Sequence, residues 1–311
     1  MAKKPSSARR PRISRIILWT GVTVILLAII AYFGIGFIAA DISTRPERQF
    51  SADLTPAKYG MAYEDIKVTA RTDGMQIPGW FIPAQGSNRV VLMVPGRNQS
   101  RTSELYGRFV ELASNIHATG LNILMIDLRG HGQAPDAHYS FGLIDRRDVA
   151  GAVDWLVQRG FNQNGIGALG ISLGSSAVIG AAAEGAKIGA IVEDSCFAEI
   201  YPIIKEKFTP ESGLPGILLT PTLWMVRLRY GYDMTQARPL EEIGNLAPRP
   251  LMIIHSTSDE LVPEAQAEQL RAAYPQAETW ILSGPEHARS FNAYPAEYSQ
   301  RVNAFFAKHL K

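Results

Sequence analysis

The chain has 311 residues, of which 46% are hydrophobic and 19% are charged. This composition is typical of a folded globular protein with a sizeable core and excludes a largely disordered chain. The formal net charge is +2, but six basic residues lie within residues 1–15, which leaves 25 basic against 29 acidic residues elsewhere. A mildly acidic remainder gives no support to nucleic-acid binding. The single cysteine, Cys196, excludes an intrachain disulfide.

An uncharged apolar stretch of 25 residues, from Ile16 to Ala40, follows the basic tail. As a helix it would be about 37 Å long, enough to cross a hydrocarbon core of about 30 Å. We therefore predict a transmembrane helix at 16–40. A cleaved signal peptide is the alternative, because the end of the stretch resembles a weak cleavage site. The usual apolar region of a signal peptide is only about 7–15 residues long, which favours the anchor.

The flanks of this stretch predict its orientation. Six basic residues precede it, whereas the charges of residues 41–60 balance. The positive-inside rule then places a cytoplasmic tail at 1–15 and residues 41–311 outside, as in a single-pass membrane protein. Residues 41–60 are predicted to be a linker, because Pro46 and Pro56 disfavour a long helix.

Residues 61–311 alternate short apolar runs with longer amphipathic ones and form the predicted domain. The apolar runs are nearly continuous, which is typical of strands buried on both faces of a largely parallel sheet. The alternation predicts an open α/β sheet. We expect strands at 66–70, 79–82, 90–94, 122–128, 166–171, 189–194, 251–256 and 279–283, and helices around 103–117, 144–159, 174–185, 264–273 and 296–310.

Residues 199–245 interrupt this alternation, since they hold no clear strand. The segment contains several prolines and an apolar region around Trp224. A small helical cap over a site and simple packing of helices on the sheet edge both fit this pattern.

Ser172 lies in a G-x-S-x-G motif, with Gly170 two residues before it and Gly174 two residues after it. The motif follows the apolar run 166–171 and precedes a helix rich in small residues. Glycines at these places permit a tight strand-to-helix turn that lifts a serine hydroxyl above the sheet edge. A loop of small residues is the plainer interpretation, but the strand–turn–helix setting favours a nucleophile.

A serine hydroxyl needs a base to accept its proton and an acid to orient that base. In this type of fold the chain order is serine, acid, histidine. Three histidines follow Ser172, and His287 lies in a Gly- and Pro-containing loop just after a strand. Loops at the carboxyl ends of strands are where open α/β sheets bind ligands. We predict His287 as the base, because His255 ends a buried run and His309 lies in the terminal amphipathic helix.

Asp259 is the predicted orienting acid. It lies three residues beyond the strand at 251–256 and 28 residues before His287. The alternative interpretation is that Asp259 only caps the helix that follows. Glu193 and Asp194, at the end of the preceding strand, are the other candidate acids.

An acyl-transfer site also needs two backbone N–H donors for the oxyanion. One is predicted to be the amide of Leu173, directly after the nucleophile. The other is predicted to be the amide of Arg97, in the loop after the strand at 90–94, where Gly96 lets the backbone turn. The side chain of Arg97 is expected to be solvated, with contact to an acidic substrate group as the alternative.

These motifs together resemble the α/β-hydrolase family, and most closely its membrane-anchored Bem46-type and ABHD-type serine hydrolases. The resemblance covers about residues 60–308. It rests on GISLGS around Ser172, HSTSDELVP around Asp259, GPEHARS around His287 and IDLRGHGQA at 126–134. It implies an α/β-hydrolase fold, a mostly parallel central sheet flanked by helices, here with one N-terminal transmembrane helix.

The resemblance also implies that His131, in the last of these motifs, is structural. One departure concerns the loop that supplies the oxyanion donor. The family usually has His-Gly there, whereas this chain has Pro95-Gly96. The amide of Arg97 remains available as the donor.

We therefore expect a membrane-anchored serine hydrolase in which Ser172 attacks an acyl carbonyl, His287 transfers the proton and Asp259 orients His287. The resemblance implies cleavage of a carboxylic ester or thioester through an acyl-enzyme. The substrate is expected to be a small-molecule or lipid acyl compound, and the predicted anchor and the apolar segment 199–245 motivate the lipid. A serine peptidase, an acyltransferase and a catalytically silent membrane-tethered scaffold are the alternatives. No metal-binding or phosphate-binding motif occurs in the sequence, so no cofactor or metal is expected. Nothing in the sequence specifies an oligomeric state.

Overall fold

The computed structural model describes residues 10–311, so most of the basic tail predicted at 1–15 lies outside the described residues. The sheet has eight strands: β1 (Glu64–Thr69), β2 (Gln76–Ile82), β3 (Val90–Val94), β4 (Asn122–Ile126), β5 (Ile166–Ile171), β6 (Ala190–Asp194), β7 (Leu251–Ser256) and β8 (Glu278–Leu282). The helices are α1 (Arg10–Thr44), α2 (Glu104–Gly107), α3 (Phe109–His117), α4 (Arg146–Gln158), α5 (Leu173–Ala183), α6 (Ile200–Ser212), α7 (Leu219–Tyr230), α8 (Pro239–Glu242), α9 (Glu264–Ala273), α10 (Ser290–Ala293) and α11 (Pro295–His309).

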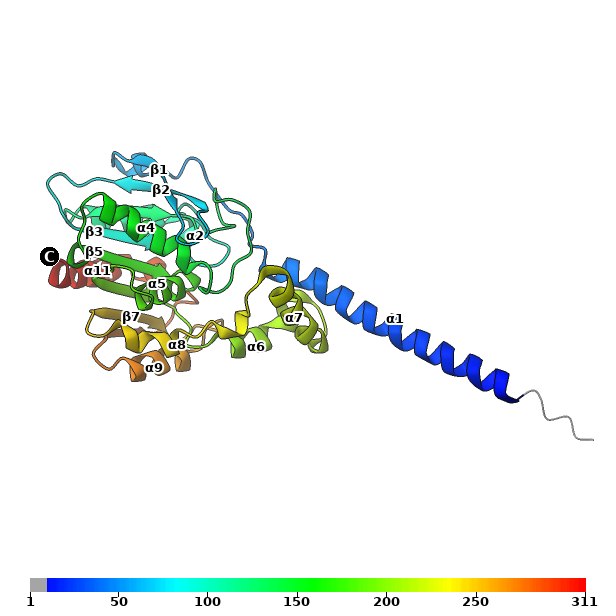
Figure 1. The fold of residues 1–311 in the computed structure, drawn as a ribbon. Helices are drawn as coiled ribbons and strands as arrows, with labels where there is room; N and C mark the ends of the chain where they lie inside the picture. Colours follow the sequence, from blue (N-terminus) through cyan, green and yellow to red (C-terminus); the bar gives the residue numbers. More distant parts are fainter. Residues whose placement is uncertain (1–9) are drawn as a thin grey trace, which may run out of the picture.

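The strands lie in the order β1-β2-β4-β3-β5-β6-β7-β8. The β1–β2 and β2–β4 pairs are antiparallel, and β3 to β8 are joined by parallel pairs. Because the last six strands run the same way, the loops after β3, β5, β7 and β8 all leave the same edge of the sheet. The predicted fold, a mostly parallel sheet flanked by helices, is confirmed (Figure 1).

Helices cover both faces of the sheet, and the strands bury side chains on both. Along β3, Val90, Leu92 and Val94 pack on the face that carries α4, α5 and α9. Val91 and Met93 pack on the opposite face, which carries α3 and α11. This two-sided burial explains why the strand has no polar face in the sequence.

Helix α1 extends away from the domain as a single rod (Figure 1). Between Arg15 and Thr44 it is long and apolar enough to cross a membrane. It continues four residues beyond the predicted end at Ala40, because no proline interrupts it before Pro46 and Thr44 bonds back to the Ala40 carbonyl at 2.6 Å.

The segment after α1 lies on the domain. The Glu47 amide donates to the Asn98 side chain at 3.1 Å, and the Ser51 amide donates to the Thr102 hydroxyl at 2.9 Å. Residues Pro56–Tyr59 form a short helical turn that begins with the proline. The segment predicted as a linker is therefore anchored at several points to the domain.

Helices α6, α7 and α8 occupy the segment that interrupts the strand–helix alternation. Helix α7 lies beside the domain-proximal end of α1, and α6 lies between α7 and the sheet (Figure 1). The Tyr32 hydroxyl on α1 donates to the Ile217 carbonyl just before α7, at 3.0 Å. This segment thus joins the N-terminal helix to the domain.

Candidate active site

Ser172 occupies the turn between β5 and α5, and its backbone is strained. Its φ of 51° and ψ of −113° lie in a region that residues with a side chain rarely adopt. The Ser172 amide donates to the Asp194 carbonyl at 2.8 Å, which holds the turn on the neighbouring strand. A side chain at Gly174 would collide with the backbone of Val94 and Pro95, so the motif needs glycine there. This is the geometry of a nucleophile elbow.

The structure brings Ser172, His287 and Asp259 together, although they are far apart in the chain. The Ser172 hydroxyl lies 2.9 Å from Nε2 of His287, and Nδ1 of His287 lies 2.7 Å from Oδ2 of Asp259. The other oxygen of Asp259 accepts the amides of Leu261 and Val262 at 3.0 and 2.7 Å. These backbone bonds fix the carboxylate, so that it can orient the imidazole for proton transfer from the serine.

The other candidate histidines do not reach Ser172. His255 is buried at the end of β7 and its Nε2 donates to the Val262 carbonyl at 2.8 Å. Burial lowers the pKa of His255, which keeps it neutral beside Asp259. His309 lies 3.1 Å from Glu278, on the far part of α11. His131 bonds to the Arg129 carbonyl within its own turn, at 2.8 Å.

The other candidate acids bond to residues of the loop after β6. Asp194 accepts the Ser195 hydroxyl at 2.8 Å, and Glu193 accepts the Cys196 amide at 2.9 Å. Both carboxyl groups are fully buried at the end of β6. They hold the loop after β6, and Ser195 in turn accepts the amide of Ala288, the residue next to His287, at 3.1 Å.

The glycine of the predicted oxyanion loop lies against Ser172. A Cβ at Gly96 would lie 3.4 Å from the Ser172 Cβ. Within residues 10–311, neither the Arg97 nor the Leu173 amide donates a hydrogen bond. Their role as oxyanion donors stays a prediction.

Two supporting residues escaped the sequence analysis. Glu104 is buried beneath the oxyanion loop and accepts the amides of Gly96 and Leu105 at 2.7 and 2.8 Å. Ser256 bonds to the Pro285 carbonyl and so joins the loop of Asp259 to the loop of His287. No sequence signal separates these two residues from other polar residues near strand ends, since only the folded chain shows their partners.

The IDLRGHGQA turn supports the same loop from the other side. Asp127 accepts the amides of Arg101 and Gln133, each at 2.9 Å, and also pairs with the Arg101 guanidinium. The Arg101 guanidinium lies 4.4 Å from the centre of the Trp80 ring. These contacts lock the loop after β3, even though Pro95 stands where the related family usually has histidine.

The Arg97 side chain differs from its prediction, because it is paired within the protein. Its two terminal nitrogens lie 3.0 and 3.2 Å from the carboxylate oxygens of Glu211 on α6. An acidic partner 114 residues away along the chain could not be inferred from local sequence. Arg97 thus connects the oxyanion loop to α6.

Glu211→Gln is expected to loosen α6 while leaving the Ser172–His287–Asp259 arrangement intact. A paired Arg–carboxylate contact at a partly exposed position contributes up to about 1 kcal/mol. Amide hydrogen exchange should therefore become several-fold faster in α6 and stay unchanged in α5. Equal exchange of α6 in both proteins would show that this contact does not hold the helix.

The buried carboxyl group of Glu193 is expected to make the free energy of unfolding depend on pH. Burial raises its pKa to about 8, the Cys196 amide opposes this shift, and the Asp194 charge adds to it. The folded pKa lies above the ordinary 4.5, so the folded state keeps a proton that the unfolded state releases. Stability from this group is therefore greatest below about pH 4.5 and is lost as the pH rises to about 8.

Glu193→Gln removes this titration while keeping an acceptor for the Cys196 amide. The slope of unfolding free energy against pH between about 5 and about 8 should flatten by about 1.4 kcal/mol per pH unit. Thermal unfolding of both proteins across this range measures the difference. Parallel curves would mean that Glu193 is ionised in the folded protein.

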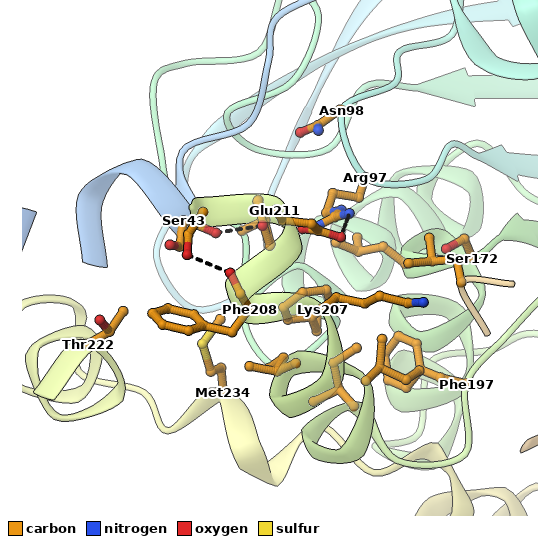
Figure 2. Close-up of a pocket in the computed structure, with 18 of the residues that line it drawn as sticks. Ser43, Arg97, Asn98, Ser172, Phe197, Lys207, Phe208, Glu211, Thr222 and Met234 are labelled. Carbon is orange, nitrogen blue, oxygen red and sulfur yellow. Dashed lines mark hydrogen bonds and ion pairs between the residues drawn. The ribbon is translucent and has the colours of Figure 1, made fainter. Parts of the chain in front are cut away.

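A pocket of about 410 Å³ leads to Ser172. Most of its lining is apolar and comes from α6, α7 and the loops at the sheet edge. Figure 2 shows Ser172 and Arg97 at one side, Phe197, Phe208 and Met234 along it, and Ser43 and Thr222 at the side away from Ser172. Such a shape suits an acyl chain whose carbonyl reaches the serine.

Residues 113–311 match the model of the prolyl oligopeptidase family, Peptidase_S9. The chain belongs to the prolyl oligopeptidase family. Members of this kind are hydrolases of the esterase or peptidase type on the α/β-hydrolase fold, and the structural neighbours of this chain agree with that assignment. The narrower resemblance to Bem46-type and ABHD-type hydrolases stays a prediction.

Two curated relatives illustrate the sequence similarity. The uncharacterized protein YfhR of Salmonella typhimurium is 28% identical over 246 residues, which covers 74% of this chain and 76% of YfhR. The uncharacterized protein YqkD of Bacillus subtilis is 25% identical over 237 residues, covering 75% of both chains.

Two solved structures share the fold. The Pyrococcus furiosus esterase Pf2001 superposes with a TM-score of 0.71 and 23% identity, covering 86% of this chain and 100% of the esterase. A puromycin-hydrolyzing peptidase of Mycobacterium tuberculosis gives a TM-score of 0.62 and 14% identity, covering 81% of this chain and 40% of the peptidase. At these identities the likeness establishes the fold alone.

Proposed function

We propose that this protein is a membrane-anchored serine esterase that cleaves carboxylic esters or thioesters through an acyl-enzyme. The observation that carries the proposal is the continuous bonding from Ser172 through His287 to Asp259. These bonds connect a serine in a nucleophile elbow, through a histidine, to a carboxylate held in place by backbone amides. This is the arrangement that activates a serine hydroxyl.

In this mechanism the Ser172 oxygen attacks the acyl carbonyl and its proton passes to Nε2 of His287. The amides of Leu173 and Arg97 bind the negative charge that develops on the carbonyl oxygen. His287 then gives the proton to the departing alcohol or thiol, and the bond between the acyl carbon and that group breaks. Water, deprotonated by His287, releases the acid and restores Ser172.

The lining of the pocket favours ester cleavage over peptide cleavage. The pocket beside Ser172 is lined mainly by aliphatic and aromatic side chains, which suit an acyl chain better than a polar peptide backbone.

The membrane part of the proposal rests on α1. Between Arg15 and Thr44 this helix is long and apolar enough to span a bilayer, and most of its large apolar side chains are exposed. The excess of basic residues before it favours a cytoplasmic N-terminus and an extracytoplasmic hydrolase domain. Neither contact with nucleic acid nor a cofactor is part of this proposal.

The test is a comparison of p-nitrophenyl esters of increasing acyl length with the matching aminoacyl p-nitroanilides, using the full chain in detergent. We expect release of nitrophenol from the esters and little release of nitroaniline. Rapid cleavage of the anilides with inert esters would identify a peptidase instead. Inertness toward both, in a folded protein, would favour the silent scaffold.

A further inference from the structure

The outer face of α7, together with the short helical turn Gly216–Leu218 that precedes it, carries large apolar side chains that the domain does not cover. Ile217, Trp224 and Leu228 are 72%, 63% and 77% exposed. Their spacing of seven and four residues places them on one face of the helical segment. The opposite face of α7 is buried, with Val226 fully enclosed. An exposed apolar stripe of this kind needs an occupant.

The position of α1 indicates that the occupant is the lipid bilayer, because α7 packs directly on this candidate membrane span. A Cβ at Gly36 would come within 2.8 Å of Pro221, so the two helices touch at their backbones. The ring of Phe33 stacks on Trp224 with centres 6.1 Å apart. The exposed stripe is therefore continuous with the apolar surface of the candidate membrane span.

The contacts also set the depth of α7. Phe33 lies 17 residues after Ile16, which is about 25 Å along a helix and so within a hydrocarbon core of about 30 Å. Further along α1, at Phe37 and Asp41, the partners become polar. Arg229 donates to the Phe37 carbonyl at 2.7 Å and the Tyr230 hydroxyl donates to Asp41 at 3.1 Å. Apolar contacts thus precede charged ones, as at a membrane interface.

The pocket extends from Ser172 to the contact between α1 and α7. Ile42 and Ser43 at the end of α1, and Thr222 and Leu223 on α7, line it together with Ser172. Figure 2 shows Ser43 and Thr222 on the side away from Ser172. One end of the pocket therefore lies at the contact of α1 with α7, and the other lies at the candidate nucleophile.

We propose that α7 is immersed in the leaflet on the domain side and that the pocket receives its acyl chain from the bilayer at the α1–α7 contact. The substrate is then a membrane-resident ester with a long acyl chain, whose carbonyl stops at Ser172. The immersion of α7 rests on the membrane anchoring in the proposed function, and the substrate class rests also on its esterase activity.

Immersion is tested with the full chain in phosphatidylcholine vesicles. Cys196 is buried, and Cys196→Ser supplies a background for single reporters at Ile217→Cys and Leu228→Cys, with Ala272→Cys on exposed α9 as the control. A nitrobenzoxadiazole label at the first two sites should be quenched by doxyl-labelled lipid and shielded from iodide, and the control should behave oppositely. Quenching by iodide at both reporters overturns the proposal. So does shielding from both quenchers, which would indicate a protein partner or a second copy.

The substrate class is tested with Trp224→Ser/Leu228→Ser, neither of which lines the pocket, against the apolar control Trp224→Phe/Leu228→Ile. Losing two apolar side chains that the proposal places in the bilayer should slow hydrolysis of a vesicle-borne long-chain ester by about tenfold or more. The control should keep most of this rate, and soluble p-nitrophenyl acetate should be cleaved equally by all three proteins. Equal rates on the vesicle ester would overturn bilayer entry. Loss of wild-type activity on both esters would instead refute the proposed function and leave the quenching result unaffected.

Discussion

Ser172→Ala is expected to lower kcat/KM for every ester that the protein cleaves by at least about 10⁴-fold, because no other oxygen can take the place of the nucleophile. Its hydroxyl is the one that lies 2.9 Å from Nε2 of His287. Alanine removes the nucleophile without a steric cost, and its methyl group fits the same strained turn as serine. Thermal unfolding should therefore change little. Initial rates on a p-nitrophenyl ester, with both proteins at equal concentration, measure the effect.

Ser175 provides the matched control for this substitution. Its hydroxyl is buried three residues further on in α5 and donates to the Gly170 carbonyl at 2.7 Å. Ser175→Ala should lower stability by about 1 kcal/mol through the lost hydrogen bond and leave the chemical step in place. If Ser172→Ala kept more than a few per cent of wild-type activity while Ser175→Ala lost it, Ser172 would not be the nucleophile.

Asp259→Asn is expected to lower kcat by about 10⁴-fold while the protein stays folded. The amide can still accept the Leu261 and Val262 amides through its oxygen, which turns its NH₂ group toward Nδ1 of His287. Nδ1 must then accept a hydrogen bond, so the proton moves to Nε2 and the imidazole can no longer take the serine proton. KM should change much less than kcat, since the pocket is unaltered.

His255 distinguishes this effect from general damage to the loop. It lies 3.7 Å from Asp259 but donates to the Val262 carbonyl. His255→Gln keeps a donor there and is expected to retain kcat within about tenfold. A comparable loss in both variants would mean that Asp259 acts by shaping the loop, and the acid would have to be sought elsewhere.

The parallel part of the sheet was predictable because its strands are continuous apolar runs with sharp polar ends. The strands at 90–94, 166–171 and 251–256 and the helix at 264–273 begin and end where the residue pattern indicates. The meeting of Ser172, Asp259 and His287 was predictable for a related reason. Each follows such a strand, and parallel strands deliver their following loops to one edge.

What the sequence could not indicate depends on contacts between distant segments. The pairing of Arg97 with Glu211 joins residues 114 apart, and the bond of Tyr32 to the Ile217 carbonyl joins residues 185 apart. No local pattern of residues indicates either contact. The packing of α7 on α1 also depends on the small size of Gly36, and the sequence does not indicate which helix packs against this glycine. The role of Glu104 beneath the oxyanion loop is of the same kind.

Labelling with a fluorophosphonate is the most direct test of whether Ser172 is a serine activated by His287. This reagent forms a stable bond only with a serine whose hydroxyl is activated by a base, so it does not require the natural substrate to be known. Membranes containing the full chain are labelled, and the modified peptide is located by mass spectrometry. We expect a single adduct on Ser172 that is lost in both Ser172→Ala and His287→Ala. An adduct that persists in Ser172→Ala, or a folded wild-type protein that takes no label, would contradict the assignment of Ser172 as the activated nucleophile.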